Sequence, residues 1–246
     1  MDATAYRQFA ELEDTHFWFL ARRRIFFHLL DRLLEGRRGL RILEIGCGSG
    51  GMLRTLSRYG DVTGLDISMD VLRFARSRGA EGLCVASGHA LPVRPHSLDL
   101  IALFDAIEHI PDDVRVLREC QRALKPGGLV FLSVPAYQFL YANNDRVAHH
   151  LRRYTRRQLR DRLSTAGLAP VKVTYFNTLL FPLILPTVLA MKLQESFRPV
   201  GDRTNLSHHV PAPLNRLLAD VIGSERHLLS GIDFPFGHSI IGVGRA

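Results

Sequence analysis

The sequence of 246 residues contains few cysteines, few lysines and one tryptophan. The three cysteines, Cys47, Cys84 and Cys120, are odd in number and form no C-x-x-C pair. This pattern argues against a zinc ribbon or a disulfide framework and favours a reducing compartment. No basic stretch followed by an apolar run opens the chain, so we predict no signal peptide and expect a cytoplasmic location.

Lysine is so scarce that Lys125, Lys172 and Lys192 are the only ones, and the remaining basic residues are arginines. The 32 basic and 24 acidic residues give a formal net charge of +8. Arginine suits fork-like contacts to carboxylate and phosphate, although codon usage in a GC-rich genome would produce the same excess. Two local arginine groups, at 22–24 and 152–157, are candidates to flank an active site.

Alternating apolar runs and helical patterns organise the chain. The pattern from Tyr6 to Leu34 predicts two helices with a break near Asp14–Thr15. Five short apolar runs then alternate with helical segments, including a predicted helix at 49–60 that Gly60 ends. The predicted strands are 40–46, 61–66, 82–86, 97–104 and 129–135, followed by a helix at 155–168 and strands at 171–176 and 237–246. This rhythm predicts an α/β fold with a doubly wound, mainly parallel sheet, whose strands are buried on both faces.

A glycine-rich turn follows the first predicted strand, with the sequence Glu44-Ile45-Gly46-Cys47-Gly48-Ser49-Gly50-Gly51. Glycines at such a turn let the backbone approach a ligand, and the following helix presents free N–H groups. Asp66 lies 20 residues after Gly46, at the end of the second strand, where an acid can hold ribose hydroxyls. We therefore predict a nucleoside-containing cofactor. The spacing also fits G-x-G-x-x-G, so an NAD(P)-dependent oxidoreductase is a competing class.

Further motifs over residues 40–135 resemble the class I S-adenosylmethionine-dependent methyltransferases. They are the E-x-G-C-G-x-G loop, Asp66, Ala90-Leu91-Pro92, Leu98-Asp99-Leu100-Ile101, Asp105-Ala106-Ile107-Glu108-His109-Ile110 and Leu124-Lys125-Pro126-Gly127-Gly128. The resemblance implies a Rossmann-like, seven-stranded sheet with an antiparallel last strand, and S-adenosyl-L-methionine as the cofactor. The cofactor-binding residues it implies are Glu44, Gly46, Cys47, Gly48, Gly50, Asp66, Ile67, Ser87, Gly88, His89, Phe104 and Asp105. The chain departs from the family at Ser87-Gly88-His89, where an acid usually meets the adenine edge.

The loops after the fourth and fifth strands are candidates for the acceptor site, because ligands bind beyond the carboxyl ends of such strands. An oxygen acceptor needs alignment and a base, and histidine suits that role near neutral pH. We predict His109 and His150 as catalytic residues, with a loop-packing role for His109 as the alternative. We predict no metal. The alternative is a metal site at Asp105, Glu108 and His109, which have a D-x-x-E-H spacing. This spacing is similar to the metal-binding E-x-x-E-H of certain ubiquinone-pathway and small-RNA O-methyltransferases. His149 or His150 could add a further ligand for Mg²⁺ or Mn²⁺.

The polar segment 143–154 resembles the H-x-R-R-Y stretch of a bacterial branch of these enzymes, which also carries an H-x-W-F-x-x-R like His16 to Arg22. We interpret it as an acceptor-binding wall, with a salt-bridged connector as the alternative. The predicted acceptor-binding residues are Arg22, Tyr137, Asp145, Arg152, Arg153 and Tyr154. Trp18 and Arg22 either cover the cofactor or belong to the core.

We expect a single domain made of an N-terminal helical lid at 1–39 and a methyltransferase domain at 40–246, with a helical insertion at 177–235. The window Val173–Met191 carries no charge, but Pro182 and Pro186 argue against a membrane-spanning helix. We interpret the insertion as a cap over the acceptor site. Peripheral contact with the inner face of the membrane and a dimer interface remain alternatives, and the oligomeric state is open.

These features predict a methyltransferase that acts on a small molecule, at an oxygen of an apolar or anionic acceptor such as an isoprenoid, a quinone-like ring or a lipid-linked sugar. An RNA methyltransferase is the main alternative, because of the +8 charge. Dispersed basic residues and the loop FDAIEH, in place of N/D-P-P-Y/F, argue against a nucleic-acid partner. A cofactor-binding domain without catalysis is a third possibility.

Overall fold

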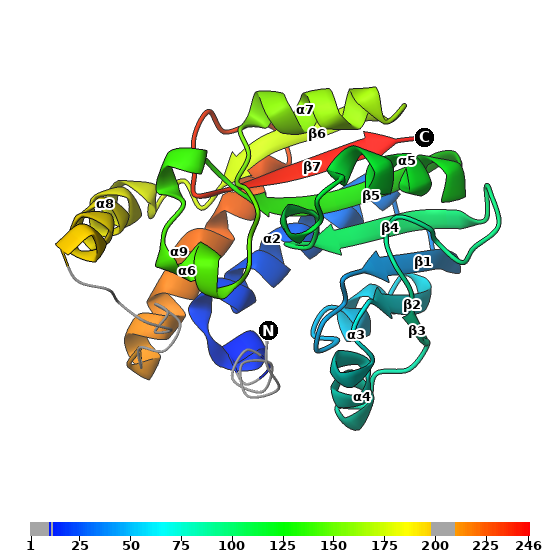
Figure 1. The fold of residues 1–246 in the computed structure, drawn as a ribbon, viewed down its shortest axis with the longest axis horizontal. Helices are drawn as coiled ribbons and strands as arrows, with labels where there is room; N and C mark the ends of the chain where they lie inside the picture. Colours follow the sequence, from blue (N-terminus) through cyan, green and yellow to red (C-terminus); the bar gives the residue numbers. More distant parts are fainter. Residues whose placement is uncertain (1–9, 11, 198–209) are drawn as a thin grey trace.

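A seven-stranded sheet forms the centre of the computed structural model, which describes residues 10, 12–197 and 210–246 (Figure 1). The strands are β1 (Leu40–Ile45), β2 (Gly60–Asp66), β3 (Leu83–Val85), β4 (Leu98–Phe104), β5 (Leu124–Pro135), β6 (Ala169–Phe176) and β7 (Ser239–Arg245). Their order is β3-β2-β1-β4-β5-β7-β6. Only β7 runs antiparallel to its neighbours, β5 and β6. The predicted doubly wound sheet with an antiparallel last strand is confirmed.

Helices cover both faces of this sheet. In chain order they are α2 (Phe17–Leu34), α3 (Leu53–Leu56), α4 (Met69–Ser77), η1 (Ile107–His109), α5 (Asp113–Ala123), η2 (Gln138–Leu140), α6 (Asn143–Val147), α7 (Arg156–Thr165), α8 (Phe181–Phe197) and α9 (Ala212–Leu229). Helix α2 packs on α9, and α5 lies near α7 (Figure 1). All seven residues of β4 are buried and all but Asp99 are apolar, as expected for a central strand. The expectation of strands buried on both faces is wrong at one edge of the sheet, because β2 has two buried residues and β3 has none.

The N-terminal helix α2 is part of the core. Phe26 stacks on Phe104 with ring centroids 5.3 Å apart and meets Phe176 edge-on at 5.4 Å. The break before α2 falls at His16, whose side chain caps the helix by accepting a hydrogen bond from the Trp18 N–H. This is close to the predicted break at Asp14–Thr15. The predicted helix over residues 6–9 lies outside the described residues.

One predicted helix is much shorter in the structure. The segment 49–60 contains only the four residues of α3, and Gly60 begins β2 instead of ending a helix. Pairing of β2 with β1 starts at Leu40 and Gly60, where a Cβ on Gly60 would lie 2.0 Å from the Leu40 carbonyl oxygen. This close approach requires glycine, so strand pairing decides the role of Gly60.

The segment 177–235 contributes α8 and α9, while residues 198–209 between them lie outside the described part. Helix α8 extends away from the sheet in Figure 1. Among the described helices, none combines the length and the apolar character that a membrane span requires.

Candidate active site

A cavity of about 810 Å³ opens at the carboxyl ends of the parallel strands and reaches from the glycine loop to α8. This volume is in the usual range for small-molecule sites. All but one of the predicted cofactor-binding residues line it: Glu44, Gly46, Cys47, Gly48, Asp66, Ile67, Ser87, Gly88, His89, Phe104 and Asp105. Gly50 is not among the lining residues. A Cβ there would lie 3.2 Å from the Cβ of Ala80, so Gly50 packs against the protein.

The glycine loop is held against the acid that follows β2. Gly46 has a φ of +72°, and a Cβ there would lie 2.7 Å from that of Ala106, so the loop can approach η1 closely only with glycine. The N–H of Gly48 donates to Asp66 Oδ2 at 3.1 Å, and the N–H of Ser68 donates to Oδ1 at 3.0 Å. These bonds fix the Asp66 carboxylate at the cavity wall, where it could also hold ribose hydroxyls.

The environment of Glu44 indicates whether S-adenosylmethionine fits this end of the cavity. Its side chain is 2% exposed, and Oε2 has no hydrogen-bond partner among the described residues. Burial, together with the nearby carboxylates of Glu13 and Asp66, raises the pKa of Glu44 well above its usual range. A buried carboxyl group of this kind is suited to a cation, and the cofactor carries an ammonium group on its methionine part. The residues present therefore fit the cofactor.

A short segment before α2 contacts the glycine loop through Glu13. The sequence analysis did not assign Glu13 to the site. Glu13 Oε2 accepts hydrogen bonds from Ser49 Oγ at 2.5 Å and from Arg78 at 2.9 Å. Arg78 also donates to Asp14 at 2.9 Å. The N-terminal segment is thus tied to both the loop and α4 beside the cavity.

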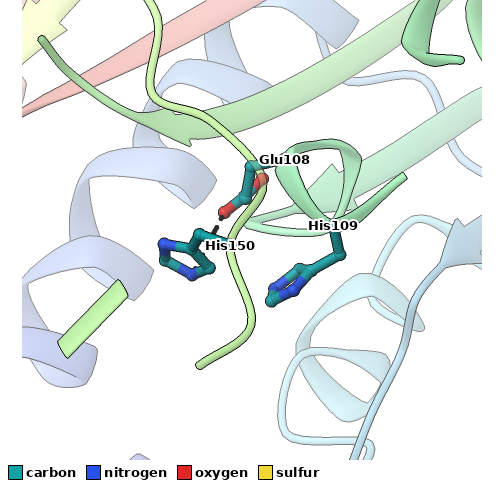
Figure 2. Close-up of side chains that lie close together, drawn as sticks. All are labelled: Glu108, His109 and His150. Carbon is teal, nitrogen blue, oxygen red and sulfur yellow. Dashed lines mark ion pairs between the residues drawn. The ribbon is translucent and has the colours of Figure 1, made fainter. Parts of the chain in front are cut away.

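The two predicted catalytic histidines both line the cavity and lie close together, with Glu108 beside them (Figure 2). The rings of His109 and His150 are 4.8 Å apart and nearly perpendicular. Burial and the neighbouring His150 lower the pKa of His109, which favours its neutral form. His150 Nε2 lies 4.0 Å from Glu108 Oε1.

Asp145 orients His150. Its Oδ1 accepts hydrogen bonds from His150 Nδ1 and Arg153 Nε, each at 2.8 Å, and its Oδ2 accepts from the Ala142 N–H at 2.9 Å. Burial alone would raise the pKa of Asp145, but the bonds from His150 and Arg153 bring it down to about 2. An ionised Asp145 keeps the proton of a neutral His150 on Nδ1 and leaves Nε2 free to accept another.

Glu108 is fully buried, and neither of its carboxylate oxygens has a hydrogen-bond partner among the described residues. Burial and the charge of Asp105 raise its pKa well above the usual range. Ligand atoms of Glu108, His109 and His150 lie within 4.8 Å of one another, so these three residues could hold a divalent cation. Asp105 is not part of this cluster and pairs with Arg22 at 2.6 Å. The absence of a metal stays a prediction.

The predicted acceptor-binding residues divide into two groups. Arg22, Asp145 and Arg153 line the cavity, and each is engaged in an ion pair. The other three are not among the lining residues and support the surrounding loops. Tyr137 stacks on Tyr175 at 5.1 Å, Arg152 donates to the Pro111 carbonyl at 2.8 Å, and Tyr154 donates to Asp113 at 2.9 Å. For Arg152 and Tyr154 this geometry matches the connector alternative.

Sequence reasoning missed two polar residues at the far side of the cavity, Asn177 after β6 and His238 before β7. Their positions at strand ends were a usable signal, but neither belongs to a recognised motif. Asn177, Asp105 and Tyr137 all adopt positive φ, of 55°, 50° and 61°, directly after or close to the ends of β6, β4 and β5. Backbone conformations of this kind often occur at functional sites.

The strand order, the antiparallel β7 and the glycine loop facing Asp66 define a Rossmann-like methyltransferase fold. Residues 43–132 match the family described as "Methyltransferase domain". Residues 43–132 are therefore similar to the class I S-adenosylmethionine-dependent methyltransferases, and this match favours the methyltransferase interpretation over the NAD(P)-dependent one.

Solved structures show the same fold at low sequence identity. A putative methyltransferase from Haloferax volcanii, in complex with the activator Trm112, is 22% identical with a TM-score of 0.61, over 100% of this chain and 95% of that chain. A methyltransferase from Mesorhizobium loti is 21% identical with a TM-score of 0.57, over 88% of this chain and 95% of that one.

Two curated relatives are ubiquinone biosynthesis O-methyltransferases. The protein from Vibrio cholerae is 35% identical over 115 residues, which cover 42% of this chain and 46% of the relative. That from Bordetella avium is 33% identical over 111 residues, with the same coverage. The match thus spans less than half the length of either relative.

Proposed function

We propose that this protein transfers the methyl group of S-adenosylmethionine to an oxygen of a small, apolar acceptor bound between the histidines and α8. The observation that carries the proposal is the Asp145–His150 pair, which lies in the cavity that the glycine loop also lines. Ile184, Val188 and Met191 of α8 supply apolar lining near this pair. The O-methyltransferase activity in the names of the curated relatives supports an oxygen acceptor.

In this mechanism the bound cofactor supplies a methyl group that its sulfonium already activates. The chain has to align the acceptor and remove its proton. His150 Nε2 accepts the hydroxyl proton as the oxygen attacks, and Asp145 holds the ring by Nδ1 and stabilises the imidazolium that forms. Glu44 would hold the ammonium group of the cofactor and Asp66 its ribose hydroxyls.

Methyl-labelled S-adenosylmethionine, incubated with the protein and fractionated extract of the source organism, tests the proposal. We expect label in the organic-solvent fraction and little label with the His150→Gln variant. Label in RNA would instead support the RNA methyltransferase alternative. Binding of S-adenosylhomocysteine with no label in any fraction would indicate a cofactor-binding domain without catalysis.

We further propose that α8 contacts the inner face of a membrane, where an isoprenoid or lipid-linked acceptor would be found. On α8, Leu183 and Leu193 are 68% and 63% exposed and Leu189 is about half exposed, as is Leu179 just before the helix. Exposed apolar side chains on one helix suit the interfacial region of a bilayer.

Flotation with vesicles of anionic phospholipid tests the membrane contact. We expect the wild-type protein to float, and Leu183→Asp with Leu193→Asp to abolish flotation. Leu217→Asp on α9, at a position 58% exposed, is the matched control and should still float. A wild-type protein that stays at the bottom of the gradient would contradict membrane contact without affecting the methyl-transfer proposal.

A further inference from the structure

Two residues with buried, unpartnered side-chain atoms face each other across the backbone where β6 ends and β7 begins. Asn177 Oδ1 and His238 Nδ1 are both buried and have no hydrogen-bond partner among the described residues. Phe176 pairs with Ser239 in the sheet, and the N–H of His238 donates to the Asn177 carbonyl at 3.4 Å. Both residues line the cavity, at strands on the opposite side of β4 from β2.

Local structure alone does not explain the Asn177 side chain. Its φ of 55° favours asparagine or glycine, and its N–H is held by Glu225 Oε2 at 2.7 Å. Neither feature requires a buried side-chain oxygen without a donor, because glycine would satisfy both; the residue as a whole is 2% exposed. A buried acceptor without a partner is costly, so a group that supplies a donor would stabilise this arrangement.

An aromatic ring lies beside the pair, and the charged side chains near it are joined in ion pairs. Trp18 meets the His238 ring edge-on at 6.0 Å. Arg153 is paired with Asp145, and Arg22 with Asp105. Burial and the charge of Arg153 lower the pKa of His238 to about 4, so its ring is neutral at physiological pH.

We propose that Asn177 and His238 form a second hydrogen-bonding subsite, which binds a hydroxyl group of an uncharged acceptor other than the oxygen that is methylated. A hydroxyl can donate to Asn177 Oδ1 and also bond with His238 Nδ1. A carboxylate or phosphate dianion has no proton to offer Oδ1. Small rotations of the two side chains would turn these covered atoms toward the ligand. The inference rests on the proposed function and assigns the acceptor class: an apolar phenol or alcohol with at least two oxygens.

Paired probes that differ by one hydroxyl test this subsite. We would measure binding of 1- and 2-naphthol, and of dihydroxynaphthalene isomers, to the protein saturated with S-adenosylhomocysteine. We expect at least one diol to bind about tenfold or more tightly than either naphthol, because a naphthol leaves the buried acceptor unpaired.

Two variants and one control locate the effect. Asn177→Gly keeps the positive φ and removes the amide, whereas His238→Phe keeps the ring and removes its nitrogens. We expect each to abolish the preference for the diol and to leave S-adenosylhomocysteine affinity unchanged. His227→Phe, at an exposed histidine of α9 outside the cavity lining, should keep the preference.

Equal binding of diols and naphthols by the wild-type protein, including no binding of either, would overturn the subsite. So would a preference that survives both variants. Failure of the proposed function has a different signature, namely loss of S-adenosylhomocysteine binding or of label transfer in the wild-type protein.

Discussion

Replacing Asp145 by asparagine should disable His150 and also destabilise the fold. Suppose that the asparagine oxygen accepts the hydrogen bond from the Ala142 N–H, as Asp145 Oδ2 does. The asparagine NH₂ group, a donor, then replaces the Oδ1 acceptor that faces His150 Nδ1 and Arg153 Nε. The histidine must then carry its proton on Nε2, which removes the base. We expect methyl transfer to slow by about 10²- to 10⁴-fold, the usual contribution of a general base.

The same change leaves Arg153, which is 9% exposed, without its carboxylate. Breaking a buried ion pair from one side costs about 3–5 kcal/mol, so Asp145→Asn should also lower the unfolding temperature. His150→Gln separates the two effects, because glutamine can still donate to Asp145 while lacking a base. We expect the same loss of rate with an unfolding temperature close to that of the wild-type protein.

The assay is the initial rate of label transfer to the acceptor found in the extract, measured against pH. Loss of the base should remove the rise of the wild-type rate with pH from the acidic side. S-adenosylhomocysteine affinity should be unchanged in His150→Gln and serves as the folding control. If His150→Gln keeps more than about a tenth of the activity, or an unchanged pH profile, His150 is not the general base.

Three further predictions concern other groups in the cavity. Glu44 has a raised pKa in the free protein and would ionise on pairing with an ammonium group. Binding of S-adenosylmethionine should therefore release protons and become tighter as pH rises. Titration calorimetry in buffers of different ionisation enthalpy measures this release, which Glu44→Gln should abolish. Treatment with EDTA should leave activity unchanged, and a loss that Mg²⁺ or Mn²⁺ restores would establish a metal at Glu108, His109 and His150. The pKa of His238 is lowered from 6.5 to about 4, so the unfolded chain takes up this proton at a higher pH than the folded protein. The free energy of unfolding should therefore decrease between pH 6.5 and pH 4, by up to about 3 kcal/mol. Chemical denaturation at pH 7 and pH 4 should show a smaller decrease for His238→Phe than for the wild-type protein.

The cofactor side of the site was predictable because its residues depend on short-range rules. The glycine loop follows β1 and Asp66 ends β2, and these two parallel strands pair in register from Leu40 with Gly60 to Ile45 with Leu65. Parallel neighbours with aligned ends bring their following residues together. The contact between Gly48 and Asp66 is therefore a consequence of the strand pattern.

The acceptor side was less predictable because it depends on the direction of individual side chains. Asp145 was expected to bind the acceptor, but its three hydrogen bonds are all directed to the protein. Tyr154 points to Asp113 rather than to the cavity. Asn177 and His238 come together only through pairing of β6 with β7, across about 60 residues of chain whose fold no local pattern specifies.

The side-chain directions in the structure show what the arginines near the cavity contact. Arg22 and Arg153, the arginines of the two local groups that have buried side chains, each face a carboxylate in the cavity wall. Glu108 and His109 also tend to be neutral there, since burial disfavours their charged forms. Arg23, the third arginine in the described part of the cavity lining, lies 3.6 Å from Asp14, so no arginine of that lining lacks a carboxylate partner. The net charge of +8 therefore provides no unpaired arginine in the described cavity wall, and this pairing is our reason for proposing an apolar acceptor rather than an anionic one.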